Sequence, residues 1–160
     1  MYGAPRPRSR SQASCSSAAR EASCRCAARS ARRCYSSPDR LRGLGAPYTS
    51  VYAYMLQDGG TELVLEAFSG RETEHTRIAV GQGVCGMAVA TGEDQNVPDV
   101  AAIGNYLACN LETKSELVVL IRRGQTTLGQ LDIDSDVPAG FTESHHRVVK
   151  EIADALAVLL

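Results

Sequence analysis

Two cysteines and three carboxylates between residues 80 and 135 are the side chains with the clearest capacity for chemistry. Cys85 and Cys109 are 24 residues apart, and Glu116, Asp132 and Asp134 follow at short spacing. Thiolates are nucleophiles, and carboxylic acids with a raised pKa donate protons near neutral pH. Together these groups are the parts needed to attack and reduce an oxidised sulfur atom.

The surroundings of each cysteine allow two interpretations. Cys85 follows a Gly-x-Gly sequence and opens a predicted short helix, whose positive N-terminal end favours the thiolate form. The alternative is that Cys85 is a small buried residue that packs this helix onto a sheet. Cys109 lies in a predicted loop next to Asn110, where a thiol is more readily reactive than inside an apolar strand.

The carboxylates are predicted to share one face of a sheet. Asp132 and Asp134 are two residues apart on a predicted strand, so both point to the face opposite Leu131 and Ile133. Glu116 stands among apolar residues on another predicted strand. The acids either line a pocket or face solvent. If they are crowded together, their like charges raise at least one pKa and create a proton donor.

These groups suit the reduction of a sulfoxide. A carboxylic acid protonates the sulfoxide oxygen, a thiolate attacks the sulfur, and the oxygen leaves as a sulfenic acid on the enzyme. A second thiol then forms a disulfide, which an external dithiol such as thioredoxin reduces. The remaining carboxylates can pair with an ammonium group, which would select a free amino acid over a peptide.

No metal site and no bound cofactor are expected. His75, His145 and His146 do not form a set of ligands, and the last two are expected on the surface of a helix. The four cysteines near the N-terminus have a Cys-x8-Cys-x-Cys-x7-Cys spacing that matches no familiar zinc site; they are Cys15, Cys24, Cys26 and Cys34.

The charge distribution divides the chain of 160 residues into two parts. Residues 1–45 contain ten Arg and two acids, whereas residues 46–160 contain seven Lys or Arg and sixteen acids. This asymmetry predicts a basic tail over residues 1–45 and one acidic domain over residues 46–160. The acidic domain argues against nucleic acid as a partner, and no apolar stretch is long enough to span a membrane.

The predicted tail is rich in Arg, Ser, Ala and Cys and has no hydrophobic period. We therefore expect it to be disordered or loosely helical. It lacks the apolar core of a secretory signal, although its composition resembles that of organelle transit peptides. A cytoplasmic location is expected, and an organelle is the alternative if the tail acts as a transit peptide.

The domain predicts an α+β fold with a mostly antiparallel sheet flanked by helices. Thr142 is a predicted N-cap for a closing amphipathic helix, whose apolar residues repeat at helical spacing up to Leu159. A second, short helix is expected over 84–91, and a hairpin turn over 57–60. The expected strands are 48–56, 61–68, 76–80, 95–97, 115–121 and 126–134.

Four motifs between Tyr48 and Leu160 give this chain a resemblance to the GAF-domain free methionine-(R)-sulfoxide reductases. They occur in the order found in that family: Gly-Gln-Gly-Val-Cys-Gly-Met-Ala, Gln-Asn-Val-Pro-Asp-Val, Ala-Cys-Asn-Leu-Glu-Thr-Lys-Ser-Glu-Leu-Val-Val, and Leu-Gly-Gln-Leu-Asp-Ile-Asp-Ser. The resemblance implies a GAF-like (PAS-like) fold and thiol-dependent reduction of free L-methionine-(R)-S-oxide. It also implies thioredoxin as the reductant and a possible homodimer.

The resemblance assigns roles to individual residues. Cys109 matches the attacking nucleophile, and Cys85 is a candidate disulfide partner. Three carboxylates and one tyrosine match residues that form the sulfoxide and amino-acid site: Glu116, Asp132, Asp134 and Tyr54.

Several positions depart from the family pattern. His75 stands where many members have a further cysteine that serves in recycling, and Asn110 stands where Asp is usual. Thr49 and Ser50 replace an Asn-Trp pair, and the chain has no Trp. Two alternatives therefore accompany the reductase hypothesis. One is a non-catalytic GAF module that binds a small ligand, and the other is a redox sensor in which Cys85 and Cys109 form a switch disulfide.

Overall fold

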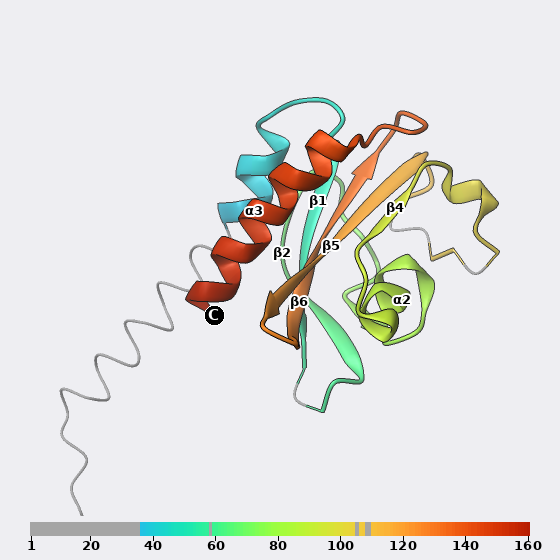
Figure 1. Cartoon of the computed structure of the whole chain (residues 1–160). Helices are drawn as coiled ribbons and strands as arrows, with labels where there is room; N and C mark the ends of the chain where they lie inside the picture. Colours follow the sequence, from blue (N-terminus) through green and yellow to red (C-terminus); the bar gives the residue numbers. More distant parts are fainter. Residues whose placement is uncertain (1–35, 58, 105, 108–109) are drawn as a thin grey trace, which may run out of the picture.

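The computed structural model describes residues 36–57, 59–104, 106–107 and 110–160. A six-stranded antiparallel sheet forms its centre, in the order β3-β2-β1-β6-β5-β4 (Figure 1). The strands are β1 Ser50–Leu56, β2 Glu62–Ser69, β3 Arg77–Ala79, β4 Gln95–Val97, β5 Ser115–Arg123 and β6 Thr126–Ser135. The helices are α2 Gly83–Thr91, the 3-10 helix η1 Val100–Ala102 and α3 Glu143–Leu159, preceded by helical residues 36–42.

The predicted α+β class, the antiparallel sheet and the β1–β2 hairpin are confirmed, with strand ends displaced by one or two residues. The sequence prediction did not include the pairing of strands that are distant along the chain. β6 lies between β1 and β5, so the first and last strands of the chain are neighbours at the centre of the sheet. Within the described residues, no helix combines the length and apolar character needed to cross a membrane.

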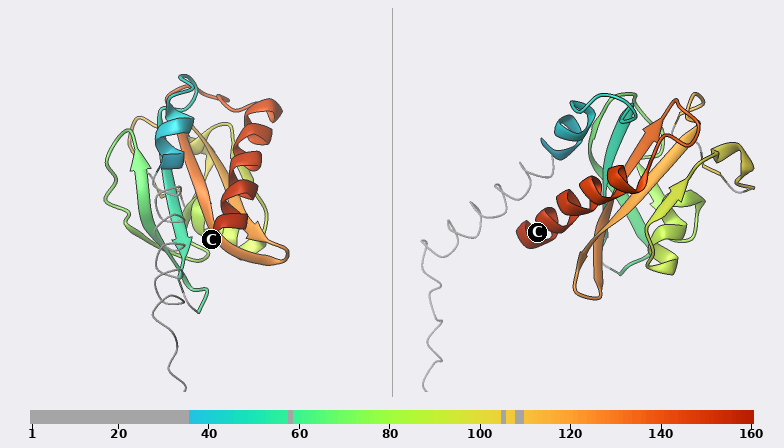
Figure 2. Two further views of the ribbon diagram at one scale, coloured as in Figure 1. Left: turned by 90° about the vertical axis from the view of Figure 1, so that its left-hand side faces the viewer. Right: turned by 45° about the horizontal axis from the view of Figure 1, so that its top comes forward.

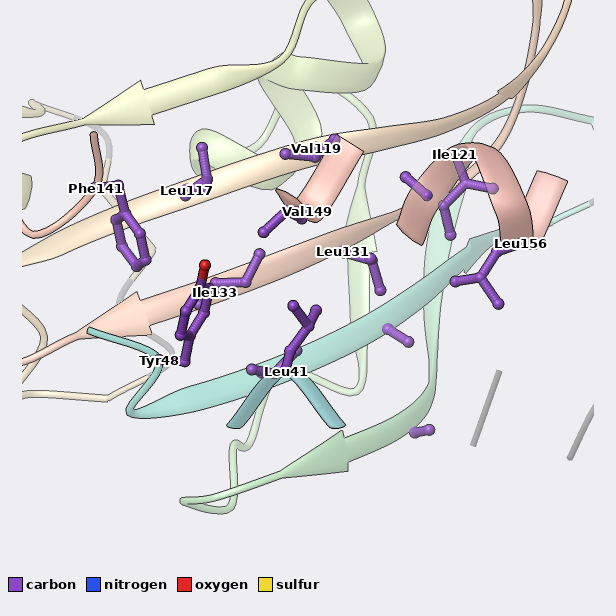
Figure 3. Close-up of a cluster of buried hydrophobic side chains, with 14 of the residues drawn as sticks. Leu41, Tyr48, Leu117, Val119, Ile121, Leu131, Ile133, Phe141, Val149 and Leu156 are labelled. Atoms are coloured by element: carbon purple, nitrogen blue, oxygen red, sulfur yellow. The ribbon is translucent and has the colours of Figure 1, made fainter. Parts of the chain in front are cut away.

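One face of the sheet packs against α3. The buried α3 residues Val149, Ala153 and Leu156 recur every three or four positions, so they form a single stripe along the helix. They meet apolar side chains that alternate along the central strands, including Leu117 and Ile133 (Figure 3). This cluster forms the larger hydrophobic core of the domain.

The opposite face carries a second, more polar core. It contains Tyr52 and Tyr54 of β1 and Val118 and Leu120 of β5, packed against buried residues of α2. Figures 1 and 2 show α2 and α3 on opposite sides of the sheet. Because successive side chains in a strand point to opposite faces, each central strand supplies both cores. The residues with predicted chemistry belong to the α2 side.

Residues 36–45 differ from the sequence prediction, which placed them in the N-terminal tail. Residues 36–42 are helical and lie beside α3 (Figure 1), and Leu41 is completely buried in the larger core next to Tyr48 (Figure 3). The sequence prediction missed this because one buried leucine in a short basic segment produces no helical period. The remainder of the predicted tail, residues 1–35, lies outside the described residues.

Leu41 provides a test of whether this helix belongs to the folded unit. We expect Leu41→Ala to lower the free energy of unfolding by about 2–5 kcal/mol, since it leaves a cavity in the core. Leu44→Ala is the matched control, because Leu44 is largely exposed and its truncation should change stability by less than about 0.5 kcal/mol. Urea denaturation of both variants measures the difference. Equal stabilities would show that the helix contributes no packing.

Candidate functional site

The sheet register brings the three predicted carboxylates together on the α2 side. Glu116 of β5 is directly opposite Asp134 of β6, and Asp132 is opposite Val118. All three acids are at least 97% buried, with exposures of 3%, 0% and 1% for Glu116, Asp132 and Asp134. We call these three residues the acidic cluster. Their burial excludes the alternative that they are solvent-facing strand charges.

Cys85 approaches the acidic cluster from the first turn of α2. Its thiol donates to Glu116 Oε1 over 3.9 Å, and its side chain is buried. The close approach depends on Gly86, since a Cβ there would lie 2.4 Å from the Ala79 carbonyl oxygen at the end of β3. Glycine thus lets the helix start pack against the sheet, which places the Cys85 sulfur beside a carboxyl group.

Cys85, Glu116 and Asp132 also form a set of potential metal ligands. One sulfur and two carboxylate oxygens lie within 4.8 Å of one another, and no other set of three such residues occurs in the described part of the chain. The histidines take no part in it. His145 Nδ1 accepts a hydrogen bond from the Thr142 N–H at the start of α3, and His146 Nε2 lies 2.9 Å from Asp94 on the α3 side.

Burial and crowding favour the protonated form of Glu116. Removal from water is the largest cause of its raised pKa, and the charges of Asp132 and Asp134 raise it further. The Tyr106 hydroxyl acts in the opposite direction, but its effect on the pKa is outweighed. A carboxyl group that keeps its proton near neutral pH can act as a general acid, so Glu116 has the property predicted from the sequence.

Asp134 has a raised pKa for similar reasons, but two neighbours oppose the shift. Burial raises its pKa most, followed by the charge of Asp132. The Thr113 hydroxyl and the Arg71 guanidinium lower the pKa. Asp134 is therefore the member of this pair that has a cation nearby, whereas the causes of the Glu116 shift include no cation.

Tyr54, predicted to bind substrate, is completely buried on the same face as the acidic cluster. Its hydroxyl donates to the His75 carbonyl oxygen over 2.8 Å, and the neighbouring Tyr52 hydroxyl donates to the Arg71 carbonyl over 3.0 Å. The two tyrosines therefore hold the segment between β2 and β3 against β1. This segment contains position 75, where the family resemblance predicts a cysteine.

One predicted site residue is outside the part of the chain that the structure describes, and three residues near the acidic cluster were not predicted from the sequence. Cys109 lies outside the described residues. Tyr106, Thr113 and Arg71 all act on the acidic cluster. Proximity in sequence to Cys109 was a signal for Tyr106 and Thr113, but Arg71 has none, because its partners are distant along the chain.

A surface hollow of about 530 Å³ lies elsewhere, between the helical residues 36–42 and the start of β1. It is lined by Asp39, Arg42, Tyr48, Thr49 and neighbouring residues. It contains no member of the acidic cluster and no thiol. This hollow is therefore separate from the acidic cluster.

Comparison of the sequence with protein-family models identifies the family of this domain. The GAF domain model matches residues 40–160. The chain belongs to the GAF domain family. The match begins just before Leu41, so it includes the part of the helix that the sequence prediction had assigned to the tail.

Proteins of similar sequence include named reductases. The chain is 36% identical over 107 residues to the free methionine-R-sulfoxide reductase of Escherichia coli, covering 67% of this chain and 63% of that protein. It is 42% identical over 99 residues to the Saccharomyces cerevisiae protein of the same name, covering 61% and 52%. The chain thus spans about half to two-thirds of the length of these relatives. Their names confirm the predicted resemblance.

Solved structures give the same result at larger coverage. The type II free methionine-R-sulfoxide reductase of Thermoplasma acidophilum superposes with a TM-score of 0.77 at 35% identity, covering 81% of this chain and 91% of that one. The Neisseria meningitidis free methionine-R-sulfoxide reductase, solved in complex with its substrate, gives 0.75 at 32% identity, covering 81% and 77%. The GAF domain of this chain therefore shares the fold of both enzymes.

The raised pKa values of Glu116 and Asp134 predict how stability changes with pH. Both groups keep a proton in the folded state that they lose on unfolding, so wild-type stability falls as pH rises above their ordinary values of 4.5 and 3.8. Glu116→Gln and Asp134→Asn remove this penalty. We expect each variant to gain stability relative to wild type as pH increases from about 4.5 to 8, by at most about 1.4 kcal/mol per pH unit.

Denaturant unfolding at several pH values measures this gain. Asp136 gives a control of opposite sign, because a hydrogen bond from Arg71 lowers its pKa. The stabilisation by Asp136 is present above its ordinary pKa of 3.8 and is lost on acidification. A constant difference between Glu116→Gln and wild type over the whole range would contradict a protonated Glu116.

Proposed function

We propose that this protein reduces free L-methionine-(R)-S-oxide to L-methionine, with Cys109 as the nucleophile. The observation that carries the proposal is the buried acidic cluster beside the Cys85 thiol, in a GAF domain whose relatives include named free methionine-R-sulfoxide reductases. A domain that only binds a neutral ligand has no need of three buried carboxyl groups, since burying each charge is costly.

The acidic cluster supports two separate tasks. Glu116 holds a proton that it can give to the sulfoxide oxygen, which makes the sulfur a better electrophile. Asp132 and Asp134 lie together on the same face, where they can pair with the substrate ammonium group. Burial favours the protonated form of Asp134 in the free enzyme, and a bound ammonium group would act with Arg71 to favour its carboxylate form. A free amino acid supplies that ammonium group, whereas a methionine sulfoxide inside a peptide does not. Tyr54 contributes to the aromatic wall of the same face.

The chemical steps conserve atoms and electrons. The Cys109 thiolate attacks the sulfoxide sulfur while the oxygen receives a proton, and methionine leaves as Cys109 becomes a sulfenic acid. A second thiol condenses with the sulfenic acid, forming a disulfide and releasing water. Oxidation of two thiols to one disulfide supplies the two electrons and two protons that convert one sulfoxide to methionine and water.

Recycling of the enzyme needs a second thiol and an external reductant. Cys85 is the proposed partner of Cys109, because His75 occupies the position at which the family resemblance predicts a further cysteine. The Cys85 sulfur is buried beside Glu116, so the Cys85 half of the proposed disulfide lies in the interior of the domain. Thioredoxin is the proposed dithiol that reduces it, with no bound cofactor, and a homodimer is the proposed assembly.

Stereospecific turnover tests the function. Purified protein with thioredoxin, its reductase and NADPH should oxidise NADPH after addition of free methionine-(R)-sulfoxide and remain inactive with the (S) form. Cys109→Ser should lower turnover by at least about 10³-fold, since the hydroxyl is a far weaker nucleophile. Cys85→Ser should release one methionine per protein and then slow with thioredoxin. Absence of turnover with excess dithiothreitol would favour the ligand-binding module, for which methionine sulfoxide should still bind.

A further inference from the structure

The backbone of Arg71 is anchored to β1 at two points. Its N–H donates to Ser50 Oγ over 3.1 Å, and its carbonyl accepts from the Tyr52 hydroxyl over 3.0 Å. Gly70 precedes it with a φ of 115°, and a Cβ there would lie 2.7 Å from Ser50 Oγ. Glycine is therefore required, and Arg71 starts from a fixed position at the end of the sheet.

The Arg71 guanidinium joins two segments that are distant in sequence. It donates to both carboxylate oxygens of Asp136, over 2.6 Å and 2.7 Å, just after the end of β6. It also lies 2.7 Å from Glu112 Oε2, in the segment 110–114 that leads into β5. A planar guanidinium suits such two-sided binding, because its donors point in fixed directions. The Arg71 side chain is only 31% exposed.

The segment 110–114 is tied to β6 next to the acidic cluster, because the Lys114 N–H bonds to Ser135, the residue after Asp134. Thr113 is buried, and its hydroxyl lowers the pKa of Asp134. Asn110 Oδ1 accepts from the Glu112 N–H over 2.8 Å, and the Lys114 N–H donates to the Ser135 carbonyl over 2.8 Å. In the sequence, this segment joins Cys109 to Glu116. A residue that fixes Glu112 therefore also restrains Thr113 beside Asp134.

We propose that Arg71 is a positioning residue for the amino-acid end of the site: by joining Asp136 to Glu112, it holds the segment 110–114 beside Asp134. This role rests on the proposed function. It concerns the part of the site that recognises the ammonium group of the substrate. The guanidinium of Arg71 is paired with two carboxylates, so the proposed role is to position this segment and not to bind the substrate. The charge of Arg71 acts in the same direction, since it favours the carboxylate form of Asp134.

The positioning role predicts a selective loss of substrate binding. Arg71→Gln should raise KM for free methionine-(R)-sulfoxide by about fivefold to tenfold, with kcat changed by less than about twofold, since Glu116 and both cysteines are untouched. Glu112→Gln should have a similar but smaller effect, and the double variant should resemble Arg71→Gln alone. Additive effects, or a fall in kcat with unchanged KM, would overturn the proposal.

Arg77→Gln is the matched control. Arg77 forms a comparable surface ion pair with Glu62 at the β2–β3 edge, away from the acidic cluster. Its removal should leave KM, kcat and thermal stability unchanged, as expected for an exposed pair. If it raises KM as much as Arg71→Gln, the effect is a general loss of charge and not positioning.

Hydrogen exchange tests the proposal independently of turnover. In Arg71→Gln, the amides of Glu112, Thr113 and Lys114 should exchange about fivefold faster than in wild type, while amides in α3 stay unchanged. Unchanged exchange in residues 110–114 would overturn the proposal even if the reductase activity is confirmed. Faster exchange in a protein without reductase activity would keep Arg71 as the positioning residue and refute the proposed reaction instead.

Discussion

The burial of three carboxyl groups on one face of the neighbouring strands β5 and β6 is the constraint on which the rest of the structure depends. Charged groups removed from water are costly, so the protein must leave protons on them or provide cations and donors nearby. Glu116 follows the first course, with burial and two acidic neighbours raising its pKa. Asp134 combines both, because burial raises its pKa while Arg71 and Thr113 lower it. The energetic cost is located where the proposed chemistry needs both a proton donor and a negative charge.

The two faces of the sheet separate stability from chemistry. The α3 side is filled with branched apolar residues and with Leu41 from the N-terminal helix, and it needs no polar partner. This larger core can offset the penalty that accumulates on the α2 side, where tyrosines, Cys85 and the acidic cluster meet. Because β5 and β6 contribute to both cores, the residues alternating with Glu116 and Asp132 fix the strands that carry them. The acidic cluster is therefore held by a scaffold whose stability comes from the other face.

Local patterns were sufficient to predict most of the fold and the acidic cluster. The alternation of polar and apolar residues in β6 predicted that Asp132 and Asp134 share one face of the sheet. The turn residues after Leu56 predicted the β1–β2 hairpin. A local pattern cannot predict contacts between residues that are far apart in the sequence. Arg71 finds its partners 65 residues away at Asp136 and 41 residues away at Glu112. Leu41 was missed for a related reason, since its burial depends on α3 and the sheet and not on its basic neighbours. Sequence periodicity was sufficient to predict the fold, whereas the ion pairs around the site could be identified only from the structure.

The two outer strands of the sheet determine how copies of this domain can meet. β3 and β4 each contain three residues, so each edge offers few free backbone groups to a strand from another chain. Short edges of this kind protect a sheet from edge-to-edge addition. Association of two domains through a continuous intermolecular sheet is therefore disfavoured, and any stable pairing must use side-chain surfaces.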